Sequence, residues 1–313
     1  MKIAHLEGLI AAPFTPMDKD GKLNLDLIPD YYRFLRDNRN TGAFICGSTG
    51  EGVSMTAEEK KSVIKAWADA AKDDKNFKVM ALVGGTSIED AKDIARYAQQ
   101  CGLYGVSFTA PFYFKPASVE MLAGCCKEIA DAVPDMPFYY YHIPVLNGVG
   151  FPMIDLLKIV DKTIFNFAGI KYTHEDFMDF LSCLNFQNGK YDMLWGRDEN
   201  MLSALAVGAK GAVGSTFNYA APLYYELIDA FNEHDLKKAQ ALQQQSIDMI
   251  YLLGKYGGIA TGKAYMKLVN LDCGEFRLPV KNMSSNEFEL FKKEVEKLDF
   301  SSFCSSKPSP VKS

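Results

Sequence analysis

The sequence predicts a closed (β/α)8 TIM barrel, an α/β fold, followed by a C-terminal helical extension. Its length of 313 residues lies within the range of one α/β barrel. Eight short apolar or alternating segments are separated by stretches with helical spacing, and most of these segments lack a polar face. Strands of that kind are typical of a parallel sheet covered by helices, and eight of them favour a closed barrel. A doubly wound open sheet is the alternative.

The expected strands are short runs that end in turn residues. They comprise 8–14, 42–48, 78–84, 105–111, 137–142, 165–172, 192–197 and 211–216.

Capping residues and apolar stripes indicate helices between these strands. Thr56 and Glu59 form a capping box before one apolar stripe. Ser87 and Asp90 repeat the box before a second helix, which Gly102 ends. Helical spacing returns at about 118–131, 153–161, 174–186, 199–208 and 221–233.

After residue 235 the pattern changes to helices alone, at about 236–255, 259–270 and 284–298. Because no Pro/Gly/Ser-rich linker separates them from the barrel, we expect one domain over 1–313. The barrel then covers about 1–235 and the extension about 236–300. Residues 301–313 have the composition of a loose tail.

Composition excludes several classes of protein. The 34 Lys+Arg and 39 Asp+Glu give a net charge of −5, so the chain lacks the basic footprint of a nucleic-acid or anionic-membrane binder. Its apolar stretches are far shorter than the roughly 20 residues of a membrane helix, and Glu7 interrupts the region where a signal peptide is apolar. Seven cysteines, an odd number without a CxxC pair, indicate thiols in a reducing compartment. We therefore expect a cytoplasmic protein.

Metal and nucleotide motifs are missing from the sequence. The four histidines make no HExxH or other ligand spacing, which argues against a zinc site. No GxGxxG fingerprint supports a nicotinamide enzyme.

Lys171 is the most informative candidate residue. Reactive groups in such a barrel gather at the carboxyl ends of the strands, and Lys171 closes an otherwise apolar strand where its ammonium should find little water. Desolvation lowers the pKa of a lysine, and a neutral amine is a nucleophile toward carbonyl carbon. The alternative is a lysine that reaches the rim of the barrel or pairs with an acid.

Two further strand ends carry polar groups that suit the same site. The turn 47–50 offers backbone N–H groups and the hydroxyls of Ser48 and Thr49, which suit a carboxylate or phosphate. Tyr141 ends the strand before that of Lys171, so its phenol can move a proton near the amine. Since residues alternate in a strand, at least one of the consecutive tyrosines 139–141 only packs.

The last two strands end in groups with two interpretations each. Asp198 and Glu199 can bind the hydroxyls of a polyol, or they can simply favour the start of the next helix. Gly214-Ser215-Thr216 occupies a position typical of a phosphate site, but no cation adjoins it on its C-terminal side, so a neutral hydroxyl contact is favoured.

Three motifs in this order carry a family resemblance over essentially the whole chain. Gly47-Ser48-Thr49-Gly50-Glu51, Tyr141-His142-Ile143-Pro144 and Gly169-Ile170-Lys171 resemble the class I aldolases of the dihydrodipicolinate synthase and N-acetylneuraminate lyase family. The synthases usually carry an arginine two residues after the Tyr-x-x-Pro proline, and Leu146 stands there instead. Gly196-Arg197-Asp198-Glu199 and Gly214-Ser215-Thr216 are similar to the sugar-contacting set of the lyases.

The resemblance implies reversible cleavage of N-acetylneuraminate to N-acetylmannosamine and pyruvate. It implies that Lys171 forms a Schiff base with the keto carbon and that Tyr141 takes the proton of the C4 hydroxyl. Ser48 would hold the pyruvate carboxylate together with Thr49, and Ser48 would relay protons to Tyr141 together with Tyr113 of the same or a neighbouring subunit. The implied contacts to the sugar are Thr173, Gly196, Asp198, Glu199 and Ser215. A homotetramer without metal or organic cofactor is also implied.

Other functions remain open from the sequence. One is another pyruvate aldolase of the family, either a 2-keto-3-deoxygluconate aldolase or a dihydrodipicolinate synthase without its arginine. A different class is a sugar-acid binding protein without turnover. A third interpretation, a phosphate-handling barrel isomerase that forms no imine, is supported only by the glycine turns.

Overall fold

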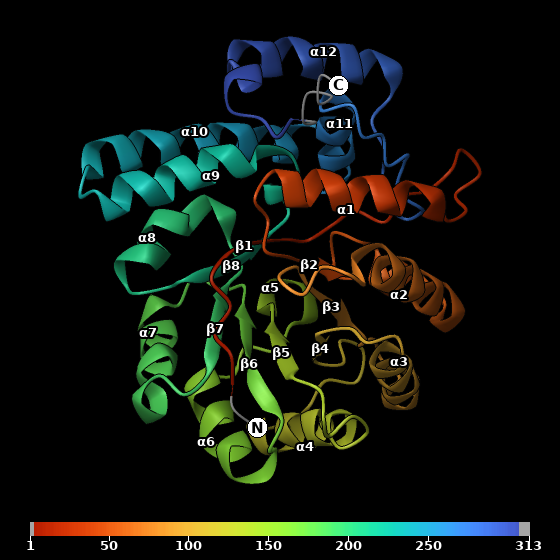
Figure 1. Ribbon diagram of the computed structural model, residues 1–313, viewed down its shortest axis with the longest axis vertical. Helices are drawn as coiled ribbons and strands as arrows, with labels where there is room; N and C mark the ends of the chain where they lie inside the picture. The colour runs from red at the N-terminus through yellow and green to blue at the C-terminus, as the bar shows by residue number, and fades with distance from the viewer. Residues whose placement is uncertain (1–2, 307–313) are drawn as a thin grey trace.

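The computed structural model describes residues 3–306 and has eight parallel strands closed into a barrel (Figure 1). Each strand pairs with the next in the chain, and β8 closes the ring against β1. The (β/α)8 prediction is confirmed, and the open sheet is excluded. The strands are β1 Gly8–Ala11, β2 Gly42–Ile45, β3 Lys78–Leu82, β4 Gly105–Phe108, β5 Phe138–His142, β6 Phe167–Tyr172, β7 Asp192–Trp195 and β8 Gly211–Gly214.

Helices surround the strands. The predicted capping box at Thr56 is present, whereas at Ser87 only the Ser87 hydroxyl accepts, from the Asp90 backbone N–H. The Thr56 hydroxyl accepts from the backbone N–H of Glu59, and the Thr56 backbone N–H donates to the Glu59 carboxylate, so α2 begins at Ala57. The barrel helices are α1 Ile28–Asp37, α2 Ala57–Ala71, α3 Ile88–Gln100, α4 Val119–Ala130, α5 Pro144–Asn147, α6 Met153–Thr163, α7 Phe177–Asn185, α8 Met201–Ala206 and α9 Phe217–Asn232. Short 3-10 turns are η1 Leu25–Leu27, η2 Gly52–Ser54, η3 Phe186–Asn188, η4 Asp198–Asn200 and η5 Phe300–Ser302.

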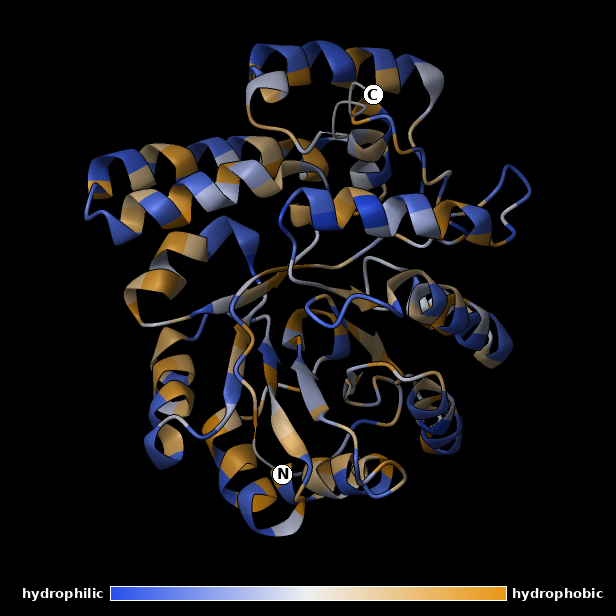
Figure 2. Cartoon of the chain, viewed as in Figure 1, coloured by the Kyte–Doolittle hydropathy of each residue, from blue (hydrophilic) through white to orange (hydrophobic). Residues whose placement is uncertain are grey.

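The sequence analysis missed helix α1. Its N-terminus has no side-chain cap and carries Pro29 as the second helical residue, so the capping signal that marks other helices is absent there. It nevertheless packs an apolar face on the barrel, with Tyr31 and Leu35 fully buried. Figure 2 shows the mixture of hydrophilic and hydrophobic residues along this outer layer of helices.

The barrel interior is a separate apolar cluster, distinct from the layer between strands and helices. Tyr139 and Tyr141 belong to the interior cluster, whereas Tyr140 packs in the outer layer. The alternation predicted for the three tyrosines therefore turns Tyr141 toward the barrel axis.

An irregularity in β6 turns Lys171 toward the same axis. Phe138 of β5 pairs with Phe167, but Tyr139 pairs with Gly169, so Ala168 is an extra residue in β6. Phe167 packs outside and Ala168 inside, and after this bulge Ile170 packs outside again. Without the extra residue the alternation would turn Lys171 outward. The bulge thus reorients the side chain, as bulges near functional sites commonly do.

Gly169 is required at this bulge, which gives a testable prediction. A Cβ there would lie 1.8 Å from the Asp192 carbonyl oxygen in β7, which is backbone and cannot rotate away. We expect Gly169→Ala to lower the free energy of unfolding by about 3 kcal/mol, at the upper end of overpacking effects. Urea denaturation measures this loss. Gly124→Ala in α4, where nothing lies within 4 Å, is the matched control and should be neutral or slightly stabilising. Equal stability of the Gly169→Ala variant and the unchanged chain would contradict the steric argument.

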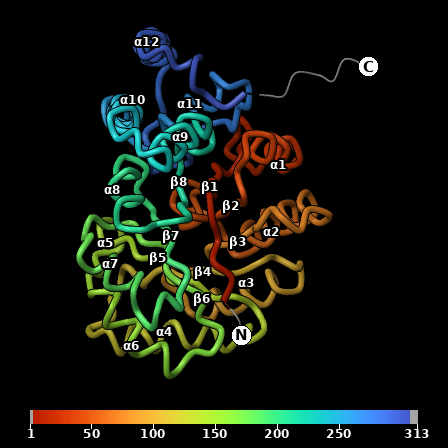
Figure 3. Tube along the Cα trace, turned by 60° about the vertical axis from the view of Figure 1, so that its left-hand side comes forward, coloured from red at the N-terminus to blue at the C-terminus, as the bar shows by residue number. Residues whose placement is uncertain are grey.

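The C-terminal extension packs beside α9 and α1 (Figures 1 and 3). Its helices are α10 Leu236–Lys255, α11 Ala260–Leu268 and α12 Ser285–Lys297. One cluster of buried apolar side chains runs from the barrel helices into these three. We propose from this shared core that barrel and extension form one domain.

The first residues of the expected loose tail are held in place. Phe303 and Ser305 are buried, Ser305 donates its backbone N–H to the Tyr219 carbonyl, and Ser306 donates to Asn38 Oδ1. Residues 301–306 are therefore not part of a loose tail, because the buried Phe303 side chain holds this segment against the fold despite its polar composition. Residues 307–313 of the tail lie outside the described residues. Among residues 3–306, no helix is long and apolar enough to cross a membrane.

Candidate active site

A cavity of about 270 Å³ opens at the carboxyl ends of the strands. Its walls come from the segments that follow β2, β5, β6, β7 and β8, closed on one side by the extension. Nine of the ten site residues expected from the sequence line it: Ser48, Thr49, Tyr141, Lys171, Thr173, Gly196, Asp198, Glu199 and Ser215. Tyr113 does not.

Lys171 has the environment expected of a nucleophilic amine. Its side chain is buried, with the residue 4% exposed, and its Nζ lies 4.1 Å from the ring centre of Phe44 and 4.1 Å from that of Tyr141. Burial lowers the pKa of Lys171 to about 7, and the negative charge of Asp198 acts in the opposite direction. Within residues 3–306 no carboxylate forms an ion pair with this ammonium. The structure therefore excludes both alternatives for Lys171, a side chain that reaches the rim of the barrel and a side chain paired with an acid.

Tyr141 stands directly beside Lys171, because the two residues are partners in the β5–β6 pairing. Its ring packs edge-on against Phe44, with ring centres 5.5 Å apart. Burial raises the pKa of the Tyr141 phenol to about 12, and the Ser48 and Thr173 hydroxyls hold it lower than burial alone would. The phenol is therefore protonated at neutral pH.

The turn after β2 is held closely against the barrel mouth. Thr15 Oγ1 donates to the Gly50 carbonyl at 2.5 Å, and a Cβ at Gly52 would lie 1.8 Å from the Cys46 carbonyl oxygen. Thr49 is buried and Ser48 half-buried, and both line the cavity. Their hydroxyls and the backbone of the turn thus face the same space as the Lys171 amine.

Asp198 is bound to Thr216, two residues after β8, rather than to the short 3-10 turn η4 that it begins. Its Oδ2 accepts from Thr216 N at 2.9 Å and from Thr216 Oγ1 at 2.6 Å. The approach requires Gly214, where a Cβ would lie 2.2 Å from Asp198 Oδ1. Burial raises the pKa of Asp198 to about 6. Of the two interpretations of the Asp-Glu pair, the helix start does not explain the Asp198 contacts.

Glu199 is partly neutralised at the edge of the cavity. Arg197 pairs with it at 2.7 Å and with Glu175 at the same distance. The two carboxylates of the Asp-Glu pair therefore differ. Asp198 is buried and accepts from the Thr216 hydroxyl, whereas Glu199 is paired with the Arg197 guanidinium near the surface.

Tyr113 lies on the loop between β4 and α4 and is 77% exposed. It packs edge-on against Phe114, with ring centres 5.0 Å apart, and Phe114 is itself exposed. The fold of the single chain does not bring Tyr113 to the other candidate residues.

Residues 5–298 match the profile of the Dihydrodipicolinate synthetase family. The chain belongs to this family. It is 38% identical to N-acetylneuraminate lyase A of Xenopus laevis, over 94% of this chain and 97% of that one. It is 36% identical to N-acetylneuraminate lyase of Homo sapiens, over 95% of this chain and 94% of that one. The solved N-acetylneuraminate lyase of Proteus mirabilis superposes with a TM-score of 0.92 at 36% identity, covering 95% of this chain and all of that one.

This member of the Dihydrodipicolinate synthetase family also has cavity residues that the sequence analysis did not select. Ile250 and Leu253 of α10 and the nearby Ile259 close one side, so the extension forms part of the wall. Thr216, which also lines the cavity, binds Asp198. Phe44 lies outside the cavity lining, and its ring contacts the Lys171 amine. Thr216 ends the expected strand 211–216, so its position could have indicated it, whereas Phe44 is only the third residue of the expected strand 42–48. Nothing in the sequence predicts that α10 lies over the open end of the barrel.

Proposed function

We propose that this chain is an N-acetylneuraminate lyase, a class I aldolase that reversibly cleaves sialic acid to N-acetylmannosamine and pyruvate. The observation that carries the proposal is a buried amine with a pKa near 7 that faces a cavity and contacts a phenol. Relatives from animals and bacteria that cover nearly the whole chain bear the name of this activity. Leu146 in place of the arginine usual in the synthases also favours the lyase.

The reaction starts at Lys171. Its neutral amine adds to the keto carbon of the open-chain sugar acid, and loss of water gives a protonated imine. As the C3–C4 bond breaks, its electrons move into the iminium to give an enamine, and the C4 hydroxyl loses its proton. N-acetylmannosamine then leaves as the aldehyde. Protonation of the enamine and hydrolysis release pyruvate and restore the amine.

Tyr141 is proposed to carry the C4 proton. Because its phenol is protonated at neutral pH, it can accept that proton only while it passes its own proton on. Ser48 and Thr49 hold the substrate carboxylate beside it, and this carboxylate or the Ser48 hydroxyl is the acceptor. Protonation of the enamine later uses the same path in reverse.

The remaining cavity residues are proposed to bind the sugar chain. Asp198 and Glu199 accept from its hydroxyls, and Thr173 and Ser215 contribute their own hydroxyls. Gly196 leaves room for the Thr173 hydroxyl beside the sugar chain, since a Cβ there would lie 1.9 Å from Thr173 Oγ1. No cofactor enters the proposal, because the iminium itself supplies the electron sink.

We also propose a homotetramer that acts in the cytoplasm. The exposed aromatic loop with Tyr113 and Phe114 supports contact with a second copy, in which Tyr113 would extend the proton path of the neighbouring site. The seven cysteines, all free thiols in the structure, support a reducing compartment. Sedimentation of the purified chain tests the assembly.

Product analysis tests the activity. Incubation with N-acetylneuraminate should give pyruvate and N-acetylmannosamine in equal amounts. If the chain does not cleave N-acetylneuraminate but cleaves 2-keto-3-deoxygluconate, or condenses pyruvate with aspartate semialdehyde, it is another aldolase of the family. Borohydride with pyruvate should add mass to the peptide that contains Lys171. A chain that binds pyruvate without this adduct is a binding protein.

The pKa of Lys171 predicts how adduct formation depends on pH. Since only the neutral amine adds to the keto carbon, the rate of pyruvate trapping should rise as pH passes about 7 and then level off. Cyanoborohydride trapping followed by mass spectrometry between pH 5.5 and 9 measures it. Asp198 favours the charged amine, so Asp198→Asn should shift the midpoint to lower pH. A midpoint near 10, where an ordinary lysine titrates, would contradict the proposed environment.

A further inference from the structure

A buried ion pair joins the turn after β2 to helix α11 of the extension. Lys263 Nζ lies 2.9 Å from Glu51 Oε1, and the two side chains are 2% and 3% exposed. Glu51 directly follows the 47–50 turn that carries Ser48 and Thr49, whereas Lys263 is more than 200 residues later in the chain. Neither residue lines the cavity that holds Lys171.

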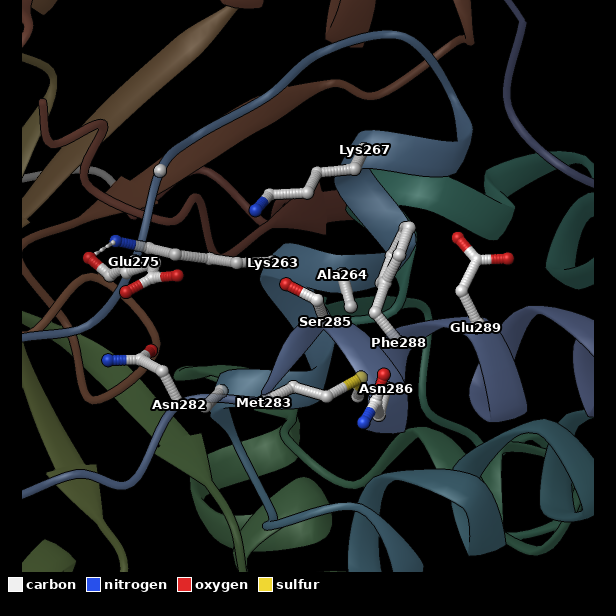
Figure 4. A pocket seen from close by; sticks show the side chains of 12 residues that line it. Lys263, Ala264, Lys267, Glu275, Asn282, Met283, Ser285, Asn286, Phe288 and Glu289 are labelled. Carbon is white, nitrogen blue, oxygen red and sulfur yellow. Dashed lines mark hydrogen bonds between the residues drawn. The ribbon is translucent and has the colours of Figure 1, made fainter. Parts of the chain in front are cut away.

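Each member of the pair has a further backbone partner. Glu51 Oε2 accepts from the Arg277 backbone N–H at 2.9 Å, and Lys263 Nζ also donates to the Glu275 carbonyl at 2.8 Å. Figure 4 shows the Lys263 side chain extended toward Glu275, with a dashed line for this hydrogen bond. A separate cavity of about 390 Å³ lies on the extension side of Lys263. The pair therefore ties the turn to both α11 and the segment that follows it.

The geometry of the turn makes this tie consequential. Glu51 has a left-handed backbone, with φ of 58°, an unusual conformation for a residue with a side chain. On the opposite side Thr15 Oγ1 holds the Gly50 carbonyl. The turn is thus clamped at two consecutive residues, by the barrel at Gly50 and by the extension at Glu51. Because backbone N–H groups bind an anion only when their directions converge, a small rotation here weakens binding.

Burial of the pair is costly unless it serves a geometric purpose. Taking two charges out of water offsets much of their attraction, and such a pair is often no more stabilising than apolar residues of similar volume. Burial lowers the pKa of Lys263, and the charge of Glu51 acts against that shift. A fixed ion pair of this kind suits positioning better than it suits stability.

We propose that Glu51 and Lys263 are positioning residues that hold the 47–50 turn in the orientation needed to bind the carboxylate of the keto acid. The extension thereby sets the affinity for the charged end of the substrate, although it contributes no charge to that site. This inference rests on the proposed function, in which the turn receives the pyruvate carboxylate.

Two ketones separate this role from general support of the fold. Pyruvate and methyl pyruvate present the same keto carbon to Lys171, but only pyruvate has a carboxylate for the turn. In Glu51→Gln and Lys263→Met, the pyruvate concentration that half-saturates cyanoborohydride trapping should rise about tenfold, because one oriented contact is weakened. The value for methyl pyruvate should change less than about twofold, well under the tenfold step.

Matched variants of the full chain complete the experiment. The double variant Glu51→Gln/Lys263→Met leaves no unpaired buried charge, so it carries the test if a single variant does not fold. Its pyruvate value should be no worse than that of either single variant, because both act through one contact. Lys255→Met removes an exposed ion pair with Glu294 in the same extension and should change neither ketone.

Two results would overturn the inference. One is an equal rise for both ketones, which is the signature of a distorted or loosened fold. The other is an unchanged pyruvate value in the single and double variants. Failure of the unchanged chain to form any adduct with pyruvate would instead reject the proposed function, and this inference with it.

Discussion

Lys171→Met should abolish cleavage of N-acetylneuraminate and, at the same time, make the protein more stable. The variant lacks the only atom that forms the imine, so no pyruvate adduct should appear at its peptide and turnover should fall to background. Methionine has nearly the volume of lysine without the charge, so it fits the contacts with Phe44 and Tyr141. Activity and stability therefore change in opposite directions, as expected where a site carries strain for function.

The stability gain follows from the depressed pKa. Folding lowers the pKa of Lys171 from 10.5 to about 7, so the unfolded chain binds the proton more tightly than the folded chain. At pH 7 this disfavours the folded state by about 4 kcal/mol, taken as an upper value from the size of the shift. The penalty is complete below pH 7 and disappears as pH approaches 10.5. The advantage of the methionine variant should shrink over that interval.

Chemical denaturation at pH 7 and pH 9.5 measures the difference between the two chains. Lys60→Met offers a comparison, since Lys60 is also buried but donates to the Gly84 carbonyl at 3.1 Å. Loss of that bond should offset part of the gain from removing the charge. A Lys171→Met variant that is less stable than the unchanged chain at pH 7 would show that the amine is stabilised in its site, against the proposed nucleophile.

The sequence carried the position of Lys171 but not the reason that it faces inward. The expected strand 165–172 is apolar up to Lys171, which places the amine near a strand end. Eight short apolar segments predict the barrel around it. The direction of the side chain depends on the extra residue Ala168, which is recognised only from pairing with β5. A bulge has no reliable signal in the local sequence, because the residues around Gly169 do not show which of them lacks a pairing partner in β5. Simple alternation from Phe167 would have turned the amine away from the cavity.

The limits at other positions have similar causes. Thr56 and Ser87 begin helices through local bonds, so sequence spacing was enough to place them. The contact of Asp198 with Thr216 and the closure of the cavity by Leu253 depend on long-range packing. Tyr113 is the clearest case, since its proposed partner is a second copy of the chain, whose position no single sequence contains.

Tyr141→Phe should separate imine formation from carbon–carbon cleavage. The ring keeps its contacts with Phe44 and with the Lys171 amine, so the pKa of the amine and pyruvate trapping should change by less than about tenfold, the step that corresponds to one pKa unit. Only the phenolic oxygen is lost. A positioned proton carrier contributes about 10²–10⁴ to a rate, so turnover of N-acetylneuraminate should fall by that factor. Steady-state turnover and single-turnover trapping, measured on the same preparation, give the two numbers.

Tyr139→Phe is the matched control, because Tyr139 also faces the barrel interior but donates to Asp192 at 2.9 Å, away from the cavity. Its loss leaves a buried carboxyl short of one donor and should lower stability by about 1–3 kcal/mol without changing turnover. Equal losses of trapping and cleavage in Tyr141→Phe would assign the phenol to imine formation instead of proton transfer. Unequal losses require the phenol to act after the imine exists, when a positive charge stands beside it. That charge favours the phenolate, so a group too weakly acidic to titrate in the empty site becomes able to exchange its proton during the reaction.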